Sequence, residues 1–241
     1  MYHNKKVSVV IPTYNEEKSI RSVVDGFFET GFVDEVIVVD NNALGNTKEE
    51  VLKTRADIVE EKRQGYGFAI MKGLLSAKGD LIVICEADGT FLPKDIEKFL
   101  SYSDEFDVVL GTRTSRSAIW SGAFMPFPVR FANWLWAKFI EVLFNGPVLT
   151  DVGCTYKLIS KKALEKIKVL FPLSKGDGRF SPELMIWLLT RRDLKIIEIP
   201  VIYKERVGKS SYTGNIFKAA KLGLKMLPLI IAYRFKDIKY E

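Results

Sequence analysis

A short apolar run that leads into turn and acidic residues lies near the start of the chain: residues 7–17 read VSVVIPTYNEE. The first five of these residues carry no charge, which predicts a buried strand that ends at Pro12. Glu16 and Glu17 favour a helix start, because negative charge is stabilised near a helix N-terminus. Apolar residues then recur at helical spacing and give the predicted helix one apolar face: Ile20, Val23, Val24, Phe27 and Phe28.

The same alternation of strand and helix continues to about residue 113. Strands are predicted at residues 35–39, 58–60, 81–85 and 107–110, and helices at 48–56, 64–77 and from Pro93. Apolar strands that alternate with helices indicate an α/β fold with a mainly parallel sheet covered on both faces. Ligands of such sheets bind beyond the carboxyl ends of the strands. Four residues lie at such ends: Pro12, Asp40, Asp88 and Arg113.

The composition is that of a globular protein with few options for histidine or cysteine chemistry. The chain has 241 residues, of which 47% are hydrophobic and 27% charged, a length that suits one large domain or a domain with an appended segment. Cys85 and Cys154 are too few for a disulfide framework, and we expect them to pack as small apolar side chains. A single histidine, His3, leaves His-based zinc sites and Ser-His-Asp catalysis close to excluded.

Positive charge is concentrated towards the end of the chain. The formal net charge is +6, and residues 204–241 hold nine basic against three acidic residues, which accounts for the whole excess. A basic amphipathic helix, kinked at Pro228, is predicted from residue 212 to about residue 235. Its apolar content favours a membrane surface over nucleic acid as the anionic partner. No transmembrane helix and no cleavable signal peptide are predicted, so we expect a cytoplasmic protein.

Acidic residues at two strand ends are candidates for ligand binding. Glu86 and Asp88 stand at i and i+2, and an extended backbone points both carboxylates the same way, so the pair could hold a divalent cation. The alternative is an acidic turn. Asp40 suits contact with a ribose or a base, or the capping of a turn. Gly67 and Lys72 would shape and charge the side of the same pocket.

Beyond residue 114 aromatic residues crowd together, from Trp120 to Phe144. This cluster is either part of the core or a lipid-facing surface, since Trp and Tyr favour membrane interfaces. Arg113, Arg116 and Arg130 lie near it. Each could bind a phosphate through two N–H groups, or remain solvated at the surface.

The ordered set of segments resembles the inverting family 2 glycosyltransferases with a GT-A fold, in particular the dolichyl-phosphate mannose synthase-like branch. Each motif alone is weakly specific, whereas the set in this order is specific. The matching segments are residues 7–17, 34–40 (DEVIVVD), 64–67 (QGYG) with 72–73, 86–89 (EADG), 111–113 (GTR), 151–158 (DVGCTYKL) and 206–211 (RVGKSS).

The resemblance implies a role for most of the candidate residues. The residues that it places around the nucleotide are Pro12, Tyr14, Glu16, Asp40, Gly67, Lys72 and Ala87, with Arg206 and Lys209 reaching the diphosphate. Asp88 would bind Mg²⁺ or Mn²⁺, with Glu86 at the first position of the metal motif. Arg113 and Arg130 would bind the acceptor phosphate. The catalytic domain would span residues 1–211, with a nucleotide-binding half (1–113) and an acceptor-binding half (114–211), followed by a membrane-surface tail (212–241).

The implied reaction moves one sugar, from GDP-mannose or a UDP-hexose, to a polyprenyl or dolichyl phosphate at the cytoplasmic face of a membrane. A phosphate acceptor is already anionic and needs no strong general base. A sugar-hydroxyl acceptor would need one, and Glu183, with Asp177 behind it, is the candidate unless these acids only cap a helix. A non-catalytic nucleotide-sugar-binding protein is a further alternative. A separate membrane anchor protein is a further possible partner.

Overall fold

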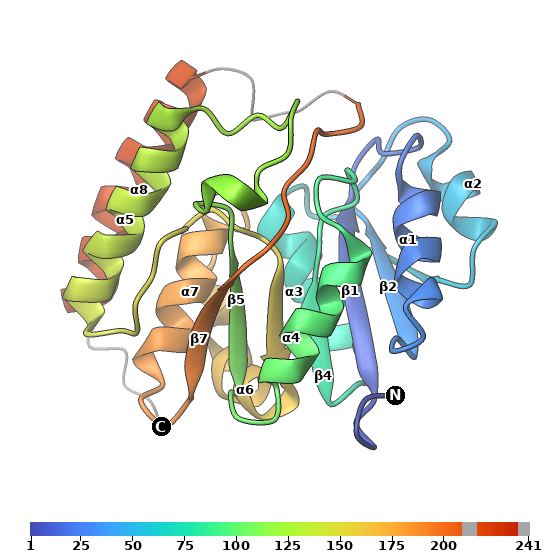
Figure 1. Cartoon of the computed structure of the whole chain (residues 1–241), viewed down its shortest axis with the longest axis horizontal. Coiled ribbons are helices and arrows are strands. Elements are labelled where there is room, and N and C mark those ends of the chain that lie inside the picture. Colours follow the sequence, from blue (N-terminus) through green and yellow to red (C-terminus); the bar gives the residue numbers. More distant parts are fainter. Residues whose placement is uncertain (209–215, 236–241) are drawn as a thin grey trace.

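The computed structural model describes residues 1–208 and 216–235, with the backbone alone for residues 216–222. Within these residues one sheet has the strand order β3-β2-β1-β4-β6-β5-β7 (Figure 1). The strands are β1 (Val7–Thr13), β2 (Glu35–Asp40), β3 (Asp57–Glu60), β4 (Leu81–Ile84), β5 (Val108–Thr112), β6 (Lys157–Ser160) and β7 (Ile196–Pro200). β6 pairs antiparallel with β4 and β5, and the other pairs are parallel. The mainly parallel sheet predicted from the sequence is confirmed.

Helices cover both faces of the sheet. One face packs against α1 (Ile20–Glu29), α2 (Thr47–Leu52) and α4 (Ile96–Tyr102). The other packs against α3 (Tyr66–Ser76), α6 (Lys161–Ile167) and α7 (Phe180–Thr190). Helices α5 (Phe127–Phe144) and α8 (Ile216–Phe235) join the same core through α7. Short 3-10 helices lie at Pro93–Asp95, Arg116–Ala118 and Lys168–Leu173. Alternation along β1 explains the two cores, because Val10 faces one helical layer while Val9 and Ile11 face the other.

Several predicted boundaries are wrong for local reasons. Helix α1 begins at Ile20, because the Glu16 carbonyl first accepts from the amides of Ser19 and Ile20 in a tight turn. Helix α2 ends at Leu52 instead of continuing to residue 56. Beyond β7, Tyr203 makes isolated bridges to Phe91 and Ile119. These segments belong to the connections beyond the sheet, where tertiary side-chain contacts override the secondary structure that the local sequence predicts.

The aromatic segment after residue 114 is divided between core and surface. Helix α5 packs beside α8 and buries Ala137, Ile140 and Phe144. Its opposite side leaves apolar rings exposed, and in the same way α8 buries some apolar residues and exposes others. The exposed apolar side chains are Trp120 and Phe124 before α5, Phe127, Phe131 and Trp134 on α5, and Leu224, Leu227, Ile231 and Phe235 on α8. The cluster is therefore part of the core on one side of the helix and exposed on the other, and contact of the exposed side with lipid stays a prediction.

The predicted C-terminal helix is present from Ile216, and Pro228 lies inside it. Its buried residues Met226, Ile230 and Tyr233 join the same core as α3 and α7. The predicted domain boundary between residues 211 and 212 and the end of the tail, 236–241, fall outside the described residues. Over the part of the chain that the structure describes, none of the helices has the length and apolar character needed to span a bilayer.

Candidate active site

Two carboxylates and an arginine meet beyond the carboxyl ends of β1 and β4. The Arg206 guanidinium donates to Oδ2 of Asp88 at 2.5 Å through Nη1, and to Glu16 through Nη2. Asp88 is also held from its own loop, because its Oδ1 accepts from the amide and the hydroxyl of Thr90 at 3.0 and 2.7 Å. The fold thus brings together three predicted site residues that are distant in the sequence.

The segment after β7 places Arg206 in this position. The Lys204 amide donates to the Thr90 carbonyl and the Val207 amide to the Asp88 carbonyl, both at 2.9 Å. The Nε atom of Arg206 is buried and has no hydrogen-bond partner within residues 1–208 and 216–235 as described. A partly buried guanidinium whose Nε–H has no partner among the described residues suits a further anionic oxygen, such as that of a phosphate.

Glu86 lies beside Asp88 and adds to the negative charge of the site. Burial, and then the charge of Asp88, raises the pKa of Glu86 to about 8, while Arg113 and Arg206 act to lower it. Burial likewise raises the pKa of Glu16 to about 7, against the effect of Arg206. Additional positive charge would therefore stabilise the ionised forms of these carboxylates.

The carboxylates fit a divalent cation that takes its other ligands from substrate. Within the described ranges, no three His, Cys, Asp or Glu side chains form a ready-made metal site. Mg²⁺ is nevertheless commonly held by one or two carboxylates together with substrate phosphates and water. Asp88 and Glu86 supply such oxygens, and the raised pKa of Glu86 marks a place where a cation would relieve repulsion.

The ends of β1 and β2 form the adjoining part of the site. Thr13 and Asp40 are register partners in these parallel strands, and Oδ1 of Asp40 accepts from the Ala43 amide at 2.8 Å. The Thr13 hydroxyl is buried without a hydrogen-bond partner in the described structure. Pro12 is buried within β1, whereas Tyr14, just beyond the strand, is 41% exposed. An unpaired hydroxyl beside a strand-end carboxylate is suited to a polar ligand.

Sequence reasoning missed Asn41, which organises this side of the site. Its Nδ2 donates to the carbonyls of Glu61 and Arg63, both at 2.8 Å, and its Oδ1 accepts from the Gly65 amide at 2.8 Å. One buried amide therefore joins the end of β2 to the loop before α3. A turn-rich loop was visible in the sequence, but nothing there distinguished Asn41 from Asn42 as the buried one.

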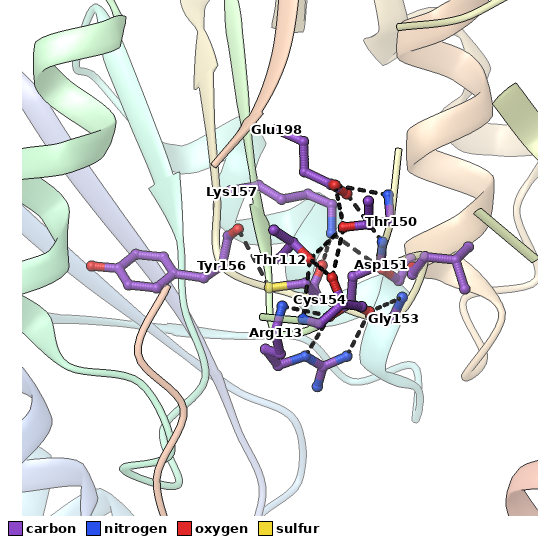
Figure 2. A network of polar contacts seen from close by, with 12 residues as sticks. Thr112, Arg113, Thr150, Asp151, Gly153, Cys154, Tyr156, Lys157 and Glu198 are labelled. Carbon is purple, nitrogen blue, oxygen red and sulfur yellow. Dashed lines mark hydrogen bonds and ion pairs between the residues drawn. The ribbon is translucent and has the colours of Figure 1, made fainter. Parts of the chain in front are cut away.

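On the opposite side of the site Arg113 is fixed by a buried carboxylate (Figure 2). Its backbone amide and Nε both donate to Oδ2 of Asp151, at 2.9 and 2.8 Å, and Nη2 donates to Oδ1 at 3.0 Å. Burial alone would raise the pKa of Asp151, but the Arg113 charge and its hydrogen bonds hold that pKa below its usual value. Arg113 is buried, so the expectation that it could be solvated at the surface is wrong.

A second carboxylate supports the Asp151 loop from β7. Glu198 accepts from the Thr150 amide and hydroxyl at 2.7 and 2.6 Å, and from the Asp151 amide at 3.1 Å (Figure 2). Burial raises the pKa of Glu198 to about 7 despite these donors. The buried Lys157 ammonium donates to the Cys154 carbonyl and, at 3.2 Å, to the Ser181 hydroxyl. The loop that holds Arg113 is therefore fixed from three strands.

Glu183 is buried in the first turn of α7, and both of its oxygens are occupied. The Ser174 hydroxyl donates to Oε2, and the Tyr233 hydroxyl of α8 donates to Oε1 at 2.9 Å. Burial raises the pKa of Glu183, while these two hydrogen bonds act to lower it. Asp177, the acid expected behind it, is instead paired with Arg179 at 2.6 Å. Glu183 is thus a satisfied internal carboxylate in this structure.

Residues 8–168 match the family model described as Glycosyl transferase family 2. This chain is a family 2 glycosyltransferase. A dolichyl-phosphate hexose transferase of Haloferax volcanii is 30% identical to it over 206 residues, which are 85% of each chain. The low-salt glycan biosynthesis hexosyltransferase Agl6 of the same organism is 28% identical over 211 residues, 85% of this chain but 49% of that protein. The glycosyltransferase described here thus spans about half the length of Agl6.

Solved structures confirm the GT-A fold of this glycosyltransferase. The glucosyl-3-phosphoglycerate synthase of Mycobacterium tuberculosis, in complex with Mn²⁺, UDP and phosphoglyceric acid, superposes with a TM-score of 0.72. The sequences are 18% identical, and the match covers 98% of this chain and 81% of that chain. At this identity the likeness concerns the fold.

Other predicted site residues of the glycosyltransferase lie around this centre in varied settings. Gly67, in α3, donates its amide to the Gly176 carbonyl at 2.8 Å, and a Cβ there would meet Phe180 at 2.7 Å. Ala87 is buried between the two acids. Lys72 is half-buried on α3, and its charge is a minor cause of the lowered pKa of Glu61, which is mainly due to Arg63. Lys209 lies outside the described residues.

Arg130 of the glycosyltransferase stands on α5, with its guanidinium 5.8 Å from the Phe127 ring centroid. One helical turn further on, Asn133 borders Gly153, and so does Arg113: a Cβ on Gly153 would lie 2.8 Å from Asn133 Oδ1 and 2.9 Å from Arg113 Nη2. Arg113 thus borders the loop at 151–153, and α5 reaches the same loop through Asn133. Their joint contact with an acceptor stays a prediction.

Proposed function

We propose that this glycosyltransferase moves a hexose from a nucleoside-diphosphate sugar to a polyprenyl or dolichyl phosphate at the cytoplasmic face of a membrane, with inversion. The 30% identity to a dolichyl-phosphate hexose transferase supports this acceptor class. The observation that carries the proposal is the state of Glu183. The carboxylate that the sequence offers as a general base is buried, with both oxygens engaged, whereas an already ionised phosphate acceptor requires no base.

On the donor side, the chain's own residues would bind and orient the diphosphate. Asp88 and Glu86 would hold a divalent cation, which, when bound, supplies positive charge that stabilises the leaving diphosphate. Arg206 has its guanidinium between Asp88 and Glu16, and its buried Nε–H has no partner among the described residues, so it can turn towards a phosphate oxygen. Pro12, Tyr14 and Asp40 would border the nucleoside.

On the acceptor side, a positioned arginine would align the nucleophile. Two of the five N–H donors of Arg113 are committed to Asp151, and its guanidinium also lies 5.1 Å from the centroid of the Tyr203 ring, which leaves part of it for a phosphate. Holding an anionic oxygen in line with the anomeric carbon accounts for much of the rate in such a displacement. A single displacement from the face opposite the leaving group inverts the anomeric configuration. Arg130 would support the acceptor from α5.

The exposed apolar rings of α5 and α8 support attachment to a membrane surface. Phe127, Phe131 and Trp134 stack in series, with ring centroids 6.1 and 5.8 Å apart, and all three are exposed. Lys225 and Arg234 are exposed on α8 beside its apolar residues. Exposed aromatic side chains on α5 and exposed basic side chains on the adjacent α8 combine the residue types of interfacial helices. A separate membrane anchor protein and the absence of nucleic-acid binding stay predictions.

The test is a comparison of acceptors at saturating donor. Purified protein is supplied with GDP-mannose, UDP-glucose or UDP-galactose, Mn²⁺ or Mg²⁺, and either a polyprenyl phosphate in detergent or a sugar with free hydroxyls. We expect transfer to the lipid phosphate, which Glu183→Gln should largely preserve. Transfer to sugar hydroxyls alone, abolished by Glu183→Gln, would establish the alternative with a carboxylate base. Nucleotide binding without transfer to either acceptor would instead indicate a nucleotide-sugar-binding protein.

A further inference from the structure

Tyr233 of α8 is joined to the beginning of α3 by a continuous series of hydrogen bonds. Its hydroxyl donates to Glu183, which also accepts from the Ser174 hydroxyl. The Ser174 oxygen accepts in turn from the Gly176 amide at 3.0 Å, and the Gly176 carbonyl accepts from the Gly67 amide at 2.8 Å. Four links thus connect the C-terminal helix to the first turn of α3.

An aromatic path runs between the same two ends. The Tyr233 ring lies 6.3 Å from that of Trp187, which lies 5.9 Å from Phe180, both in edge-on geometry. Phe180 lies directly against Gly67, where a Cβ would come within 2.7 Å of its ring. Phe180 and Trp187 are fully buried. Polar and apolar contacts therefore fix the same distance between α8 and α3.

The near end of these paths borders the candidate nucleotide site. The Gly65 amide, just before α3, donates to Asn41, which follows Asp40 directly. Burial and then the charge of Glu86 raise the pKa of the Tyr66 hydroxyl. A shift of segment 174–180 would therefore displace the first turn of α3 beside both Asp40 and Glu86.

The segment between Ser174 and Phe180 has little freedom of its own. Gly176 has a φ of +65°, and a Cβ there would come within 2.4 Å of the Phe68 ring, so the chain passes close over α3 in a left-handed conformation. Ser174 and Glu183 are both buried, so their hydrogen bond is shielded from water. Burial and the charge of Glu183 raise the pKa of Tyr233, which keeps its hydroxyl a donor.

We propose that Tyr233 and Glu183 are positioning residues, through which α8 holds segment 174–180 against the first turn of α3 and so sets the geometry of the nucleotide site. The inference rests on the proposed function only in taking this edge of the sheet as the donor site. Donor affinity then depends on how α8 packs, although none of its described side chains, at residues 223–235, belongs to the carboxylate–arginine centre formed by Asp88, Glu16 and Arg206.

The experiment compares Tyr233→Phe, which removes one hydroxyl and keeps the ring, with Tyr102→Phe, which removes an exposed hydroxyl on α4. Amide hydrogen exchange is followed in peptides covering 65–77, 174–180 and 223–235 of the full chain. Affinity for UDP and GDP with Mn²⁺ is measured by calorimetry. We expect Tyr233→Phe to accelerate exchange at 174–180 and at the start of α3, and to weaken nucleotide binding on the order of fivefold. Tyr102→Phe should change neither.

Glu183→Gln and the double variant Glu183→Gln/Tyr233→Phe separate positioning from catalysis. If the residues act as one unit, Glu183→Gln weakens the nucleotide as Tyr233→Phe does, and the double variant adds little more. Exchange that rises only within 223–235, with unchanged nucleotide affinity, would overturn the proposal. So would a loss of kcat in Glu183→Gln at normal affinity and exchange, which identifies a general base. If the wild-type protein binds no nucleotide, the proposed function fails, and the exchange data alone decide the coupling.

Discussion

The arginines of the two sides of the site differ in what holds them. Arg113 is buried and bound bidentately to Asp151, which is fully buried. Arg206 is shared between Asp88 and Glu16, and its buried Nε–H has no partner in the part of the chain that the structure describes. The first arrangement is a rigid structural pair that can still present spare donors. The second is suited to rearrangement when an anionic ligand arrives. Once Arg206 turns towards that ligand, the oxygens of the two carboxylates are available to bind a cation.

Replacement of Arg113 should therefore destabilise the protein strongly. Arg113→Ala leaves Asp151 as a buried charge without its partner, which costs about 3–5 kcal/mol. Urea unfolding of the wild type, Arg113→Ala and Arg113→Ala/Asp151→Asn measures this cost. The double variant should recover part of the loss, since its Asn is neutral. A double variant as unstable as the single one would contradict the argument that the unpaired charge is responsible.

Glu198 should give the protein a pH-dependent stability. Burial raises its pKa from 4.5 to about 7, so the folded state binds the proton more tightly than the unfolded state. Its contribution to the free energy of unfolding is therefore full below about pH 4.5 and falls as the pH rises to about 7. Glu198→Gln cannot ionise, so its stability relative to wild type should increase over this interval, by up to about 3 kcal/mol.

Urea unfolding of the wild type and of Glu198→Gln between pH 4.5 and pH 8 tests this prediction. The measured quantity is the difference between their free energies of unfolding at each pH. Other titrating groups act on both proteins and largely cancel in that difference. A difference independent of pH would show that Glu198 ionises with an ordinary pKa.

The sequence predicted those site residues whose own position in the strand pattern distinguishes them. Asp88 and Asp40 end apolar strands, and the topology of parallel sheets then places them at one edge. Asp151 and Tyr233 could not be recognised as partners of Arg113 and Glu183, because the pairs are 38 and 50 residues apart and neither partner follows a local signal. Such contacts depend on how the elements pack, which the sequence pattern does not specify.

At the scale of elements, α5 has a surface that no other described element covers. Its exposed rings stack on one another, next to Arg130. Replacing Phe127, Phe131 and Trp134 with Ser should reduce binding to vesicles of phosphatidylcholine with phosphatidylglycerol. The free energy of unfolding should change by only about 0.5 kcal/mol for each site, because these side chains are exposed.

Sedimentation with vesicles measures this, and Leu52→Ser/Leu75→Ser is the matched control. Both leucines are exposed, on α2 and α3. Equal binding by the triple variant, the control and the wild type would show that α5 does not contact the membrane.

The elements themselves were predicted unevenly. β1, β2, β4 and β5 are apolar runs between polar residues, and each was found near its true position. The antiparallel direction of β6 was not predicted, since alternation of side chains is the same in both directions. The sequence of α5 did not decide between core and surface, because the helix meets the core on one side only and two of its three buried residues, Ala137 and Ile140, are not aromatic.

At the scale of the whole molecule, ligand binding should appear as stability. A nucleotide present at about 100 times its dissociation constant raises the free energy of unfolding by about 2.7 kcal/mol. We expect UDP or GDP to raise the melting temperature only with Mn²⁺ or Mg²⁺, and Asp88→Asn to remove the dependence on metal. Asp57→Asn, at an exposed carboxylate on β3, is the control. An equal shift with and without metal in the wild type would contradict a metal at Asp88.

The order of strands in the sheet also bears on how the chain folds during synthesis. β1 to β4 form adjacent parallel pairs within residues 7–84, so half of the sheet can assemble on the ribosome early. The neighbour of β4, however, is β6, which begins at Lys157. Until that segment emerges, the apolar edge from Leu81 to Ile84 has no strand beside it and can pair with another nascent chain. Translation between residues 84 and 157 is therefore the interval in which chaperones have most to protect.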